Sequence, residues 1–364
     1  MPSLGIRLAI LKSLWANYNM NQSQNQDVKV LQDGRKKWKE RKEANLLLSL
    51  AYRNINRNKS ERLENCGDVL TFRKYSDGDL QLHAMQSCRV RLCPICAWRR
   101  SLKIYHQVEQ VTAHLSENQL AYIMLTLTVR NVDGDGLSGA IQEVLKGWRR
   151  LTQTKPFKAA VKGWFRSLEV THDINPVITE KLYAKKQGYF AKRGLYIGEG
   201  NPNYNQYHPH LHVLLAVSDK YFKSRDYLAQ SRWAELWADA MGLDYIPSVD
   251  VRRCYGDGEQ KDGVAMNKAV AEASKYAAKS CEYVIPDDWE LTGETVKVLD
   301  GALSGVRLVA FGGIMRQASK ALKLQDIESD SVDLVHVGED KPKGIAYELV
   351  QYGWHTGYRQ YVEL

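Results

Sequence analysis

Short segments in which apolar and polar side chains alternate are the clearest pattern along the chain. In AYIMLTLTVRNV (residues 121–132), Ile123, Leu125 and Leu127 fall on one face, and the residues between them fall on the other. A period of two residues predicts a β-strand with one face in the core. Further strands are predicted for WFRSLEVTHD (164–173), HPHLHVLLAV (208–217) and IPSVDVRR (246–253).

Helical periodicity separates these strands. It covers residues 103–115, 137–153, 225–242 and the Ala-rich segment VAMNKAVAEASKYAAKS (264–280), which is a strong helix former. The strands are half polar and the connections are long, which favours an antiparallel α+β sheet. A doubly wound parallel sheet would have continuously apolar strands.

Composition changes divide the chain into four parts. Residues 1–60 are polar and basic and predict a peripheral helical arm, and residues 61–105 form a cysteine-rich module. Residues 118–325 hold the predicted sheet, and residues 326–364 form an acidic tail without a readable pattern. Residues 173–206 interrupt the sheet region without a clear period, and this length predicts a flexible or DNA-facing loop.

The charge balance is basic. Lys plus Arg number 51 against 42 for Asp plus Glu, a net charge of +9, with much of the excess in the N-terminal third. This balance favours a polyanionic partner, although many enzymes are equally basic. In RKKWKERKE (35–43) the acids among the bases favour a solvated helix face, with phosphate contact as the alternative.

The sequence gives no sign of a membrane or secretory segment. It contains no run of about 18 apolar residues, and MPSLGIRLAILKSLW is interrupted by Arg7 and Lys12 and lacks a small-residue cleavage site. We therefore expect a cytoplasmic protein with no membrane contact.

Four of the six cysteines lie between residues 66 and 96, which suggests metal rather than a disulfide scaffold. Cys88, Cys93 and Cys96 have zinc-knuckle spacing, and Cys66 is the expected fourth ligand, with His83 as the alternative. A reduced buried pair or a redox motif is the simpler explanation of Cys-x2-Cys alone. The guanidinium groups around this module suit phosphate-backbone contact; they are Arg89, Arg91, Arg99 and Arg100. Cys254 and Cys281 are expected to be packing residues.

His208, His210 and His212 occupy alternate positions of one strand and therefore share a face. Three imidazoles in register favour a metal site over a set of satisfied polar residues. Glu169 lies on the predicted neighbouring strand and is a candidate further ligand, with an ion pair to Arg166 as the alternative.

Glu272 and Tyr276 are spaced i, i+4 in the Ala-rich helix, with Lys275 and Lys279 beside them. An isolated tyrosine of this kind is usually just half-buried. Next to a metal and two lysines, however, a phenol can attack a phosphate, because the cations favour phenolate and the metal polarises a phosphoryl oxygen.

These motifs together resemble the rolling-circle replication initiators of small plasmids, one-tyrosine members of the HUH endonuclease class. IMLTLTVRNV is similar to the first motif of the family, HPHLHVLL to its histidine motif, and AEASKYAAKS to its Glu-x-x-x-Tyr helix. RLVAFGGIMRQASKAL (307–322) is similar to a stretch that follows this helix in the family. The resemblance covers roughly residues 66–325.

The resemblance implies an RNA-recognition-like antiparallel sheet with flanking helices, which nicks one strand at the plasmid's double-strand origin. Tyr276 would form a 5′-phosphotyrosyl link and leave a 3′-OH primer. His210 and His212 would hold Mg²⁺ or Mn²⁺ with Glu169 as third ligand, and His208 would be an alternate or supporting group. Glu272 would be the general base at strand rejoining or release. From their charge, Lys275, Lys279 and the four arginines are expected to contact DNA.

The implied partners are origin DNA that is single-stranded at the nick, and a host helicase and DNA polymerase; the sequence leaves the oligomeric state open. The rival functions are an HUH transposase or relaxase acting on other DNA, and a zinc-containing regulator that binds DNA without cutting it. A metalloenzyme acting on a small molecule is disfavoured by the basic balance.

Overall fold

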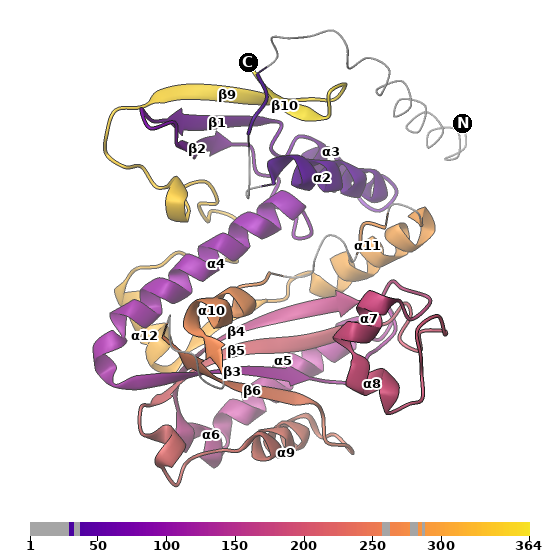
Figure 1. The fold of residues 1–364 in the computed structure, drawn as a ribbon, viewed down its shortest axis with the longest axis vertical. Helices are drawn as coiled ribbons and strands as arrows, with labels where there is room; N and C mark the ends of the chain where they lie inside the picture. The colour runs from indigo at the N-terminus through magenta and orange to yellow at the C-terminus, as the bar shows by residue number, and fades with distance from the viewer. Residues whose placement is uncertain (1–28, 33–36, 257–262, 277–282, 286–287) are drawn as a thin grey trace.

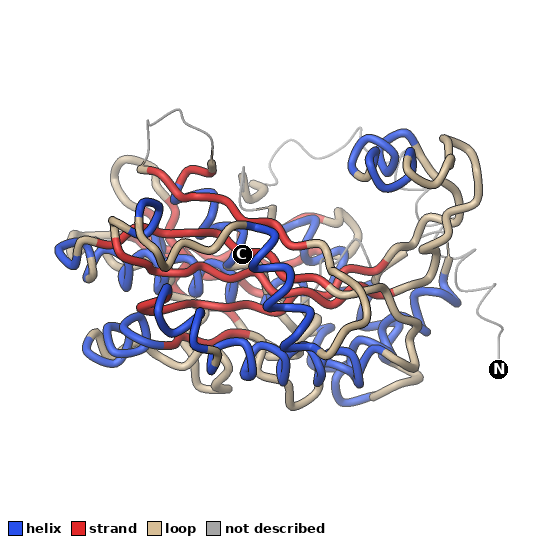
Figure 2. The backbone as a smooth tube through the Cα atoms, turned by 90° about the horizontal axis from the view of Figure 1, so that it is seen from below, coloured by secondary structure: helices blue, strands red, loops and turns tan. Residues whose placement is uncertain are grey.

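The computed structural model describes residues 29–32, 37–256, 263–276, 283–285 and 288–364. The strands are β1 (Val69–Lys74), β2 (Leu80–Met85), β3 (Leu120–Thr128), β4 (Val161–His172), β5 (Tyr207–Ser218), β6 (Val249–Tyr255), β7 (Val264–Ala265), β8 (Val309–Gly312), β9 (Glu348–His355) and β10 (Gln360–Glu363). The α-helices are α2 (Trp38–Tyr52), α3 (Arg57–Glu64), α4 (Pro94–His114), α5 (Leu137–Gln153), α6 (Lys155–Ala160), α7 (Glu180–Lys185), α8 (Gln187–Ala191), α9 (Gln230–Met241), α10 (Met266–Ala273), α11 (Trp289–Leu303) and α12 (Gly313–Ala321). Figure 2 shows the strands together with helices around them.

A six-stranded sheet has the order β7-β6-β3-β5-β4-β8, and its strands β3 to β6 lie in the lower half of Figure 1. Its pairs are antiparallel except for the short β6–β7 pair. The predicted α+β class and the four predicted strands are confirmed, because β3, β4, β5 and β6 follow the alternating segments. Leu125, Leu168 and Leu211 are fully buried, as one apolar face per strand requires.

Helices cover both faces of this sheet. α10 lies over the face that carries the histidines, since Glu272 reaches within 3.6 Å of His212 Nδ1. α5 packs against the opposite face, where Trp148 and Trp164 meet edge to face with ring centroids 5.0 Å apart. The face that carries the histidines is therefore the one under α10 (Figure 1).

A second, four-stranded sheet in the order β10-β9-β1-β2 joins the two ends of the described chain. β9 pairs with β1 from Val69↔Gly353 to Lys74↔Glu348, so the C-terminal strands complete the hairpin of the cysteine-rich module (Figure 1). The prediction of residues 326–364 as a separate tail is wrong in this respect.

The N-terminal helices are not a peripheral arm. In α2, Trp38, Leu48 and Tyr52 are fully buried, and Tyr52 donates a hydrogen bond of 2.7 Å to Asp300 of α11. Even Lys42 is fully buried, where its ammonium group donates to the carbonyls of Glu64 and Cys66. The expected solvated face in this segment therefore holds only in part, and α2, in the described part of the predicted arm, belongs to the core.

Residues 173–206 fold into a small lobe with α7 and α8, placed at the ends of β4 and β5 in Figure 1. Ile178, Leu182 and Phe190 form its own apolar cluster, and Lys186 pairs with Asp173 at 3.0 Å. The segment is therefore a folded insertion instead of a structureless loop. Within the described part of the chain, no helix combines the length and apolar character needed to cross a membrane.

Candidate active site

Three predicted ligands converge on two neighbouring strands. Glu169 of β4 lies directly opposite His210 of β5 in the antiparallel ladder, and His212 is two residues further along the same face. His212 Nε2 lies 2.9 Å from Glu169 Oε2, His210 Nε2 lies 3.5 Å from the same oxygen, and the two Nε2 atoms are 3.1 Å apart. All three side chains are buried. One atom from each residue thus faces a common point.

These distances fit a divalent cation. Ligands about 2.1 Å from a metal are separated by about 3.0 Å at 90°, close to the three distances above. Burial by itself raises the pKa of Glu169, but hydrogen bonds from His210 and His212 outweigh it and hold that pKa well below its usual range. Burial lowers the pKa of His212. An ionised carboxylate and a neutral imidazole are the states in which these groups bind metal.

The alternative ion pair between Glu169 and Arg166 is wrong. Arg166 points away and donates to the carbonyls of Arg307 and Leu308. His208 lies outside the group of converging ligands. Its ring stacks on that of His210, its carbonyl accepts from His210 Nδ1 at 3.0 Å, and burial lowers the pKa of His208 to about 4. His208 therefore supports the ring of His210.

Glu272 reaches this group from α10. Its Oε1 lies 3.6 Å from His212 Nδ1, and its Oε2 accepts from Arg252 at 2.9 Å. Lys275 adds a cation, with Nζ 3.8 Å from Glu169 Oε2. α10 and the turn that follows it thus bring a carboxylate and an ammonium group to Glu169, His210 and His212. Lys279 lies outside the described residues.

Tyr276 does not share a helical face with Glu272. α10 ends at Ala273, where the Ser274 hydroxyl donates to the Val270 carbonyl at 2.6 Å. The Tyr276 hydroxyl donates to Glu328 Oε2 at 3.1 Å, and among the described residues it makes no hydrogen bond to Glu169, His210 or His212. The prediction that the helix continues through Tyr276 is therefore wrong.

The phenol of Tyr276 is held in a buried pocket. It is 6% exposed, and the Arg100 guanidinium lies 5.4 Å from its ring centroid. Burial, followed by the negative charge of Glu328, raises the pKa of Tyr276 to about 12, against the opposing effect of Arg100 and Arg91. In this arrangement the phenol stays protonated.

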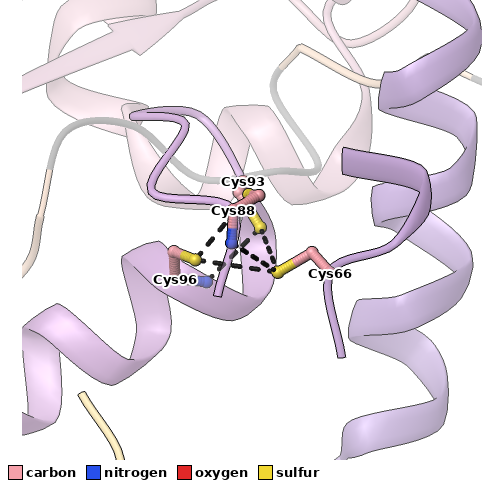
Figure 3. A group of neighbouring side chains, drawn as sticks. All are labelled: Cys66, Cys88, Cys93 and Cys96. Atoms are coloured by element: carbon pink, nitrogen blue, oxygen red, sulfur yellow. Dashed lines mark hydrogen bonds between the residues drawn. The ribbon is translucent and has the colours of Figure 1, made fainter. Parts of the chain in front are cut away.

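The four clustered cysteines form a second buried group, shown in Figure 3 with their sulfurs facing one another. The Sγ separations are 3.6 Å for Cys66–Cys93, 3.7 Å for Cys66–Cys96 and 3.8 Å for Cys88–Cys96. A tetrahedral zinc with bonds of about 2.3 Å separates its sulfurs by about 3.8 Å, whereas a disulfide requires about 2.05 Å. The group fits zinc.

His83, the alternative fourth ligand, does not take part in this cluster. His83 lies on β2, where its ring meets those of His336 and Tyr347, so it is not the fourth ligand. Cys254 is buried in β6, as expected of a packing residue, and Cys281 lies outside the described residues.

The arginines around the cysteines mainly make contacts within the protein. Arg99 is fully buried and pairs with Asp340 at 2.8 Å, so its predicted DNA contact is wrong. Arg89 donates to the Val332 carbonyl at 2.6 Å. Arg91 donates to the Val306 carbonyl and lies 3.5 Å from Glu328. Arg100 is 4% exposed, and its Nε and Nη1 atoms have no hydrogen-bond partner among the described residues.

Sequence reasoning missed Glu328 and Arg252. Glu328 is 52 residues from Tyr276, in a segment without a readable pattern, and Arg252 is 20 residues from Glu272. No local spacing signals either contact, since both depend on how separate elements pack.

An antiparallel sheet with a buried Glu-His-His group, attached to a four-cysteine module, defines an α+β protein with two candidate metal sites. The sequence profile of a family described as "Replication protein" matches residues 79–362. "Protein rep" of Bacillus amyloliquefaciens is 38% identical over 319 residues, which cover 84% of either chain. "Protein rep" of Lactiplantibacillus plantarum is 34% identical over 83% of this chain and 86% of its own.

"Protein rep" of Streptococcus pneumoniae serotype 2 is 30% identical over 88% of this chain and 91% of its own. No solved structure gives a significant match. The chain therefore belongs to the replication-protein family, and the resemblance to plasmid replication initiators is confirmed.

Proposed function

We propose that the protein nicks one strand of a plasmid's double-strand origin through Tyr276, in a reaction assisted by a divalent cation. The observation that carries this proposal is the convergence of Glu169, His210 and His212 beneath the helix that bears Glu272. Mg²⁺ or Mn²⁺ held there would polarise a phosphoryl oxygen. Family membership supports origin DNA as the substrate, with host helicase and polymerase as later partners in the cytoplasm.

The proposed step exchanges one phosphoester for another. The phenol loses its proton and its oxygen bonds to the scissile phosphorus, while the bond from phosphorus to the 3′ oxygen breaks and that oxygen takes a proton. The products are a 5′-phosphotyrosyl strand and a free 3′-OH. Because the hydroxyl of Tyr276 donates to Glu328 in the structure, the reaction requires that this hydrogen bond be given up.

Glu272 is the proposed base for the step that releases or rejoins the strand. Its carboxylate lies beside His212 and is held by Arg252, so it can accept a proton within reach of the bound phosphate. Lys275, in the turn that follows this helix, is proposed to contact a phosphate oxygen. For the cysteine cluster we propose a structural zinc.

The test incubates the purified chain with supercoiled origin plasmid and Mn²⁺, and looks for nicked DNA covalently linked to protein. We expect an adduct with the wild type and with Tyr196→Phe, a matched control at a 63% exposed tyrosine, but none with Tyr276→Phe or with EDTA. DNA binding without nicking under every metal condition would favour the non-catalytic regulator, a function for which the sequestered phenol is the supporting observation.

A further inference from the structure

A cleft of about 940 Å³ opens at the free edge of the six-stranded sheet, beside the edge strand β8. Residues 307–322 supply one wall, and α6 with the start of β4 supplies the other. This stretch is the family-like RLVAFGGIMRQASKAL segment, to which the nicking reaction assigns no role. A ligand bound in the cleft would give this segment a role.

The two glycines of this segment allow the walls to come together. A Cβ on Gly312 would meet the Trp164 ring at 2.1 Å, and a Cβ on Gly313 would meet the Lys162 carbonyl oxygen at 2.3 Å. Gly313 also has a φ of +55°, in the left-handed region that favours glycine. The close approach of β8 and α12 to β4 turns basic side chains from separate elements toward one space.

The cleft is strongly basic. Its charged lining consists of five basic side chains and one acidic one: Lys158, Lys162, Arg307, Arg316, Lys320 and Asp326. Asp326 is already paired with Arg307 at 2.8 Å. In the described part of the chain, the other four cations have no carboxylate within ion-pair distance, and each is exposed. Such a set attracts a polyanion.

The rings of the cleft pack on other parts of the fold. Phe157 is 3% exposed, Trp164 packs edge to face on Trp148, and Phe311 packs on Phe165 at 4.8 Å. Single-stranded nucleic acid is usually held by bases stacked on free rings. The cleft offers four exposed cations, while its rings already contribute to packing, and this combination suits the phosphate backbone of a double helix.

The distance between the cleft and the candidate metal site shows how long a duplex must be to contact both. Lys162 and Glu169 lie on the same strand seven positions apart, which at about 3.3 Å per residue is roughly 23 Å. Double-helical DNA rises about 3.4 Å per base pair, so a duplex arm that begins near the nick would reach the cleft after about seven base pairs.

We propose that this cleft binds the phosphate backbone of the double-stranded DNA flanking the nick, a second DNA contact separate from the metal-binding residues. The inference rests on the proposed function, because it assumes that origin DNA is the substrate.

The test compares two triple variants. Lys158→Ala/Lys162→Ala/Arg316→Ala removes three cations of the cleft, and Lys74→Ala/Lys223→Ala/Lys297→Ala removes the same charge from exposed positions outside it. Binding to duplex origin DNA is measured from about 50 to 200 mM salt. Nicking is measured separately on a short single-stranded oligonucleotide that spans only the nick.

Each lost phosphate contact lowers the slope of log affinity against log salt by about 0.9. We expect the magnitude of this slope to fall by about 2 to 3 in the cleft variant, and its duplex affinity near 0.15 M salt to fall on the order of 100-fold. The same variant should nick the oligonucleotide at the wild-type rate. The control should keep most of its affinity.

Equal losses of duplex affinity in both triple variants would overturn the inference, because the net charge of the protein would then explain the effect. An unchanged slope in the cleft variant would overturn it too, and would leave an acidic protein as the occupant of the cleft. Failure of the wild type to nick the oligonucleotide would contradict the proposed function instead, so the two failures are distinguishable.

Discussion

Replacing Glu328 with glutamine should make Tyr276 a faster nucleophile. The Glu328 Oε2 atom accepts the phenolic hydrogen, while Oε1 accepts from the backbone N–H groups of Leu308 and Val309 at 3.0 and 3.2 Å. Glutamine keeps an oxygen for the two backbone donors, removes the negative charge and offers the phenolate an N–H donor. The substitution therefore changes the charge and preserves the shape.

The size of the expected rate increase follows from the pKa of Tyr276, which burial and then Glu328 raise from 10.0 to about 12. At pH 8 this rise lowers the phenolate fraction from about 1% to about 0.01%, a factor of about 100. Two unit charges 4 Å apart at an effective dielectric of 20 interact by about 4 kcal/mol, and Arg91 and Arg100 offset much of this energy. We expect Glu328→Gln to raise the phenolate fraction of Tyr276, and with it the nicking rate, by about tenfold, which corresponds to about 1.4 kcal/mol.

The sign of the pH dependence is fixed by the same shift. A raised pKa keeps the phenol neutral, so the nicking rate should rise with pH, and in Glu328→Gln the rise should begin at lower pH. For stability, the neutral phenol contributes fully below pH 10.0, and this contribution is lost as the pH rises through about 12.

The assay is single-turnover formation of the covalent adduct on an origin oligonucleotide with Mn²⁺, from pH 7 to pH 10. Asp330→Asn is the matched control, because it removes an exposed carboxylate two residues away. If Glu328→Gln follows the wild-type profile at every pH while the adduct still forms, the contact with Glu328 does not restrain the nucleophile and the reasoning is refuted.

Three further substitutions test the two metal sites and the core. Glu169→Ala should lower Mn²⁺ affinity in calorimetric titration by at least about 10-fold, because even residues that only orient a metal ligand contribute that much, with far-UV circular dichroism unchanged; undiminished affinity would exclude this carboxylate as a ligand. Cys93→Ser should lose bound zinc by elemental analysis, whereas Cys254→Ser, also at a buried cysteine, should retain it. Arg99→Ala should lower the free energy of unfolding by about 3 to 5 kcal/mol, because the buried carboxylate of Asp340 loses the opposite charge of Arg99; a much smaller loss in denaturant unfolding would contradict that account.

The strands and the group of Glu169, His210 and His212 could be predicted because they depend on local periodicity. Alternation placed the histidines on one face, and the antiparallel order then put Glu169 opposite His210. The cysteine spacing likewise led to the four-sulfur group, because a knuckle is a local structure.

The C-terminal strands could not be predicted for the opposite reason. In β9, only Val350 and Gly353 are buried, and the remaining residues are partly or fully exposed. The strand is defined by its pairing with β1, more than 270 residues away in sequence. Similarly, the Ala-rich segment has the propensity for a longer helix than the structure shows. The bond from Ser274 to the Val270 carbonyl and the burial of Tyr276 against Glu328 end it at Ala273.

The cysteine cluster and the proposed nucleophile are parts of one structural unit. Cys93 caps the start of α4, where its sulfur accepts from the Cys96 backbone N–H at 3.4 Å, and the same helix carries Arg100 to the ring of Tyr276. From the loop that enters the cluster, Arg91 reaches Glu328, the acceptor of the Tyr276 hydroxyl. A disturbed cluster would therefore move both groups that surround the phenol. This connection links the module to the candidate active site, since Arg100 and Arg91 both lower the pKa of Tyr276 against the larger effect of its burial.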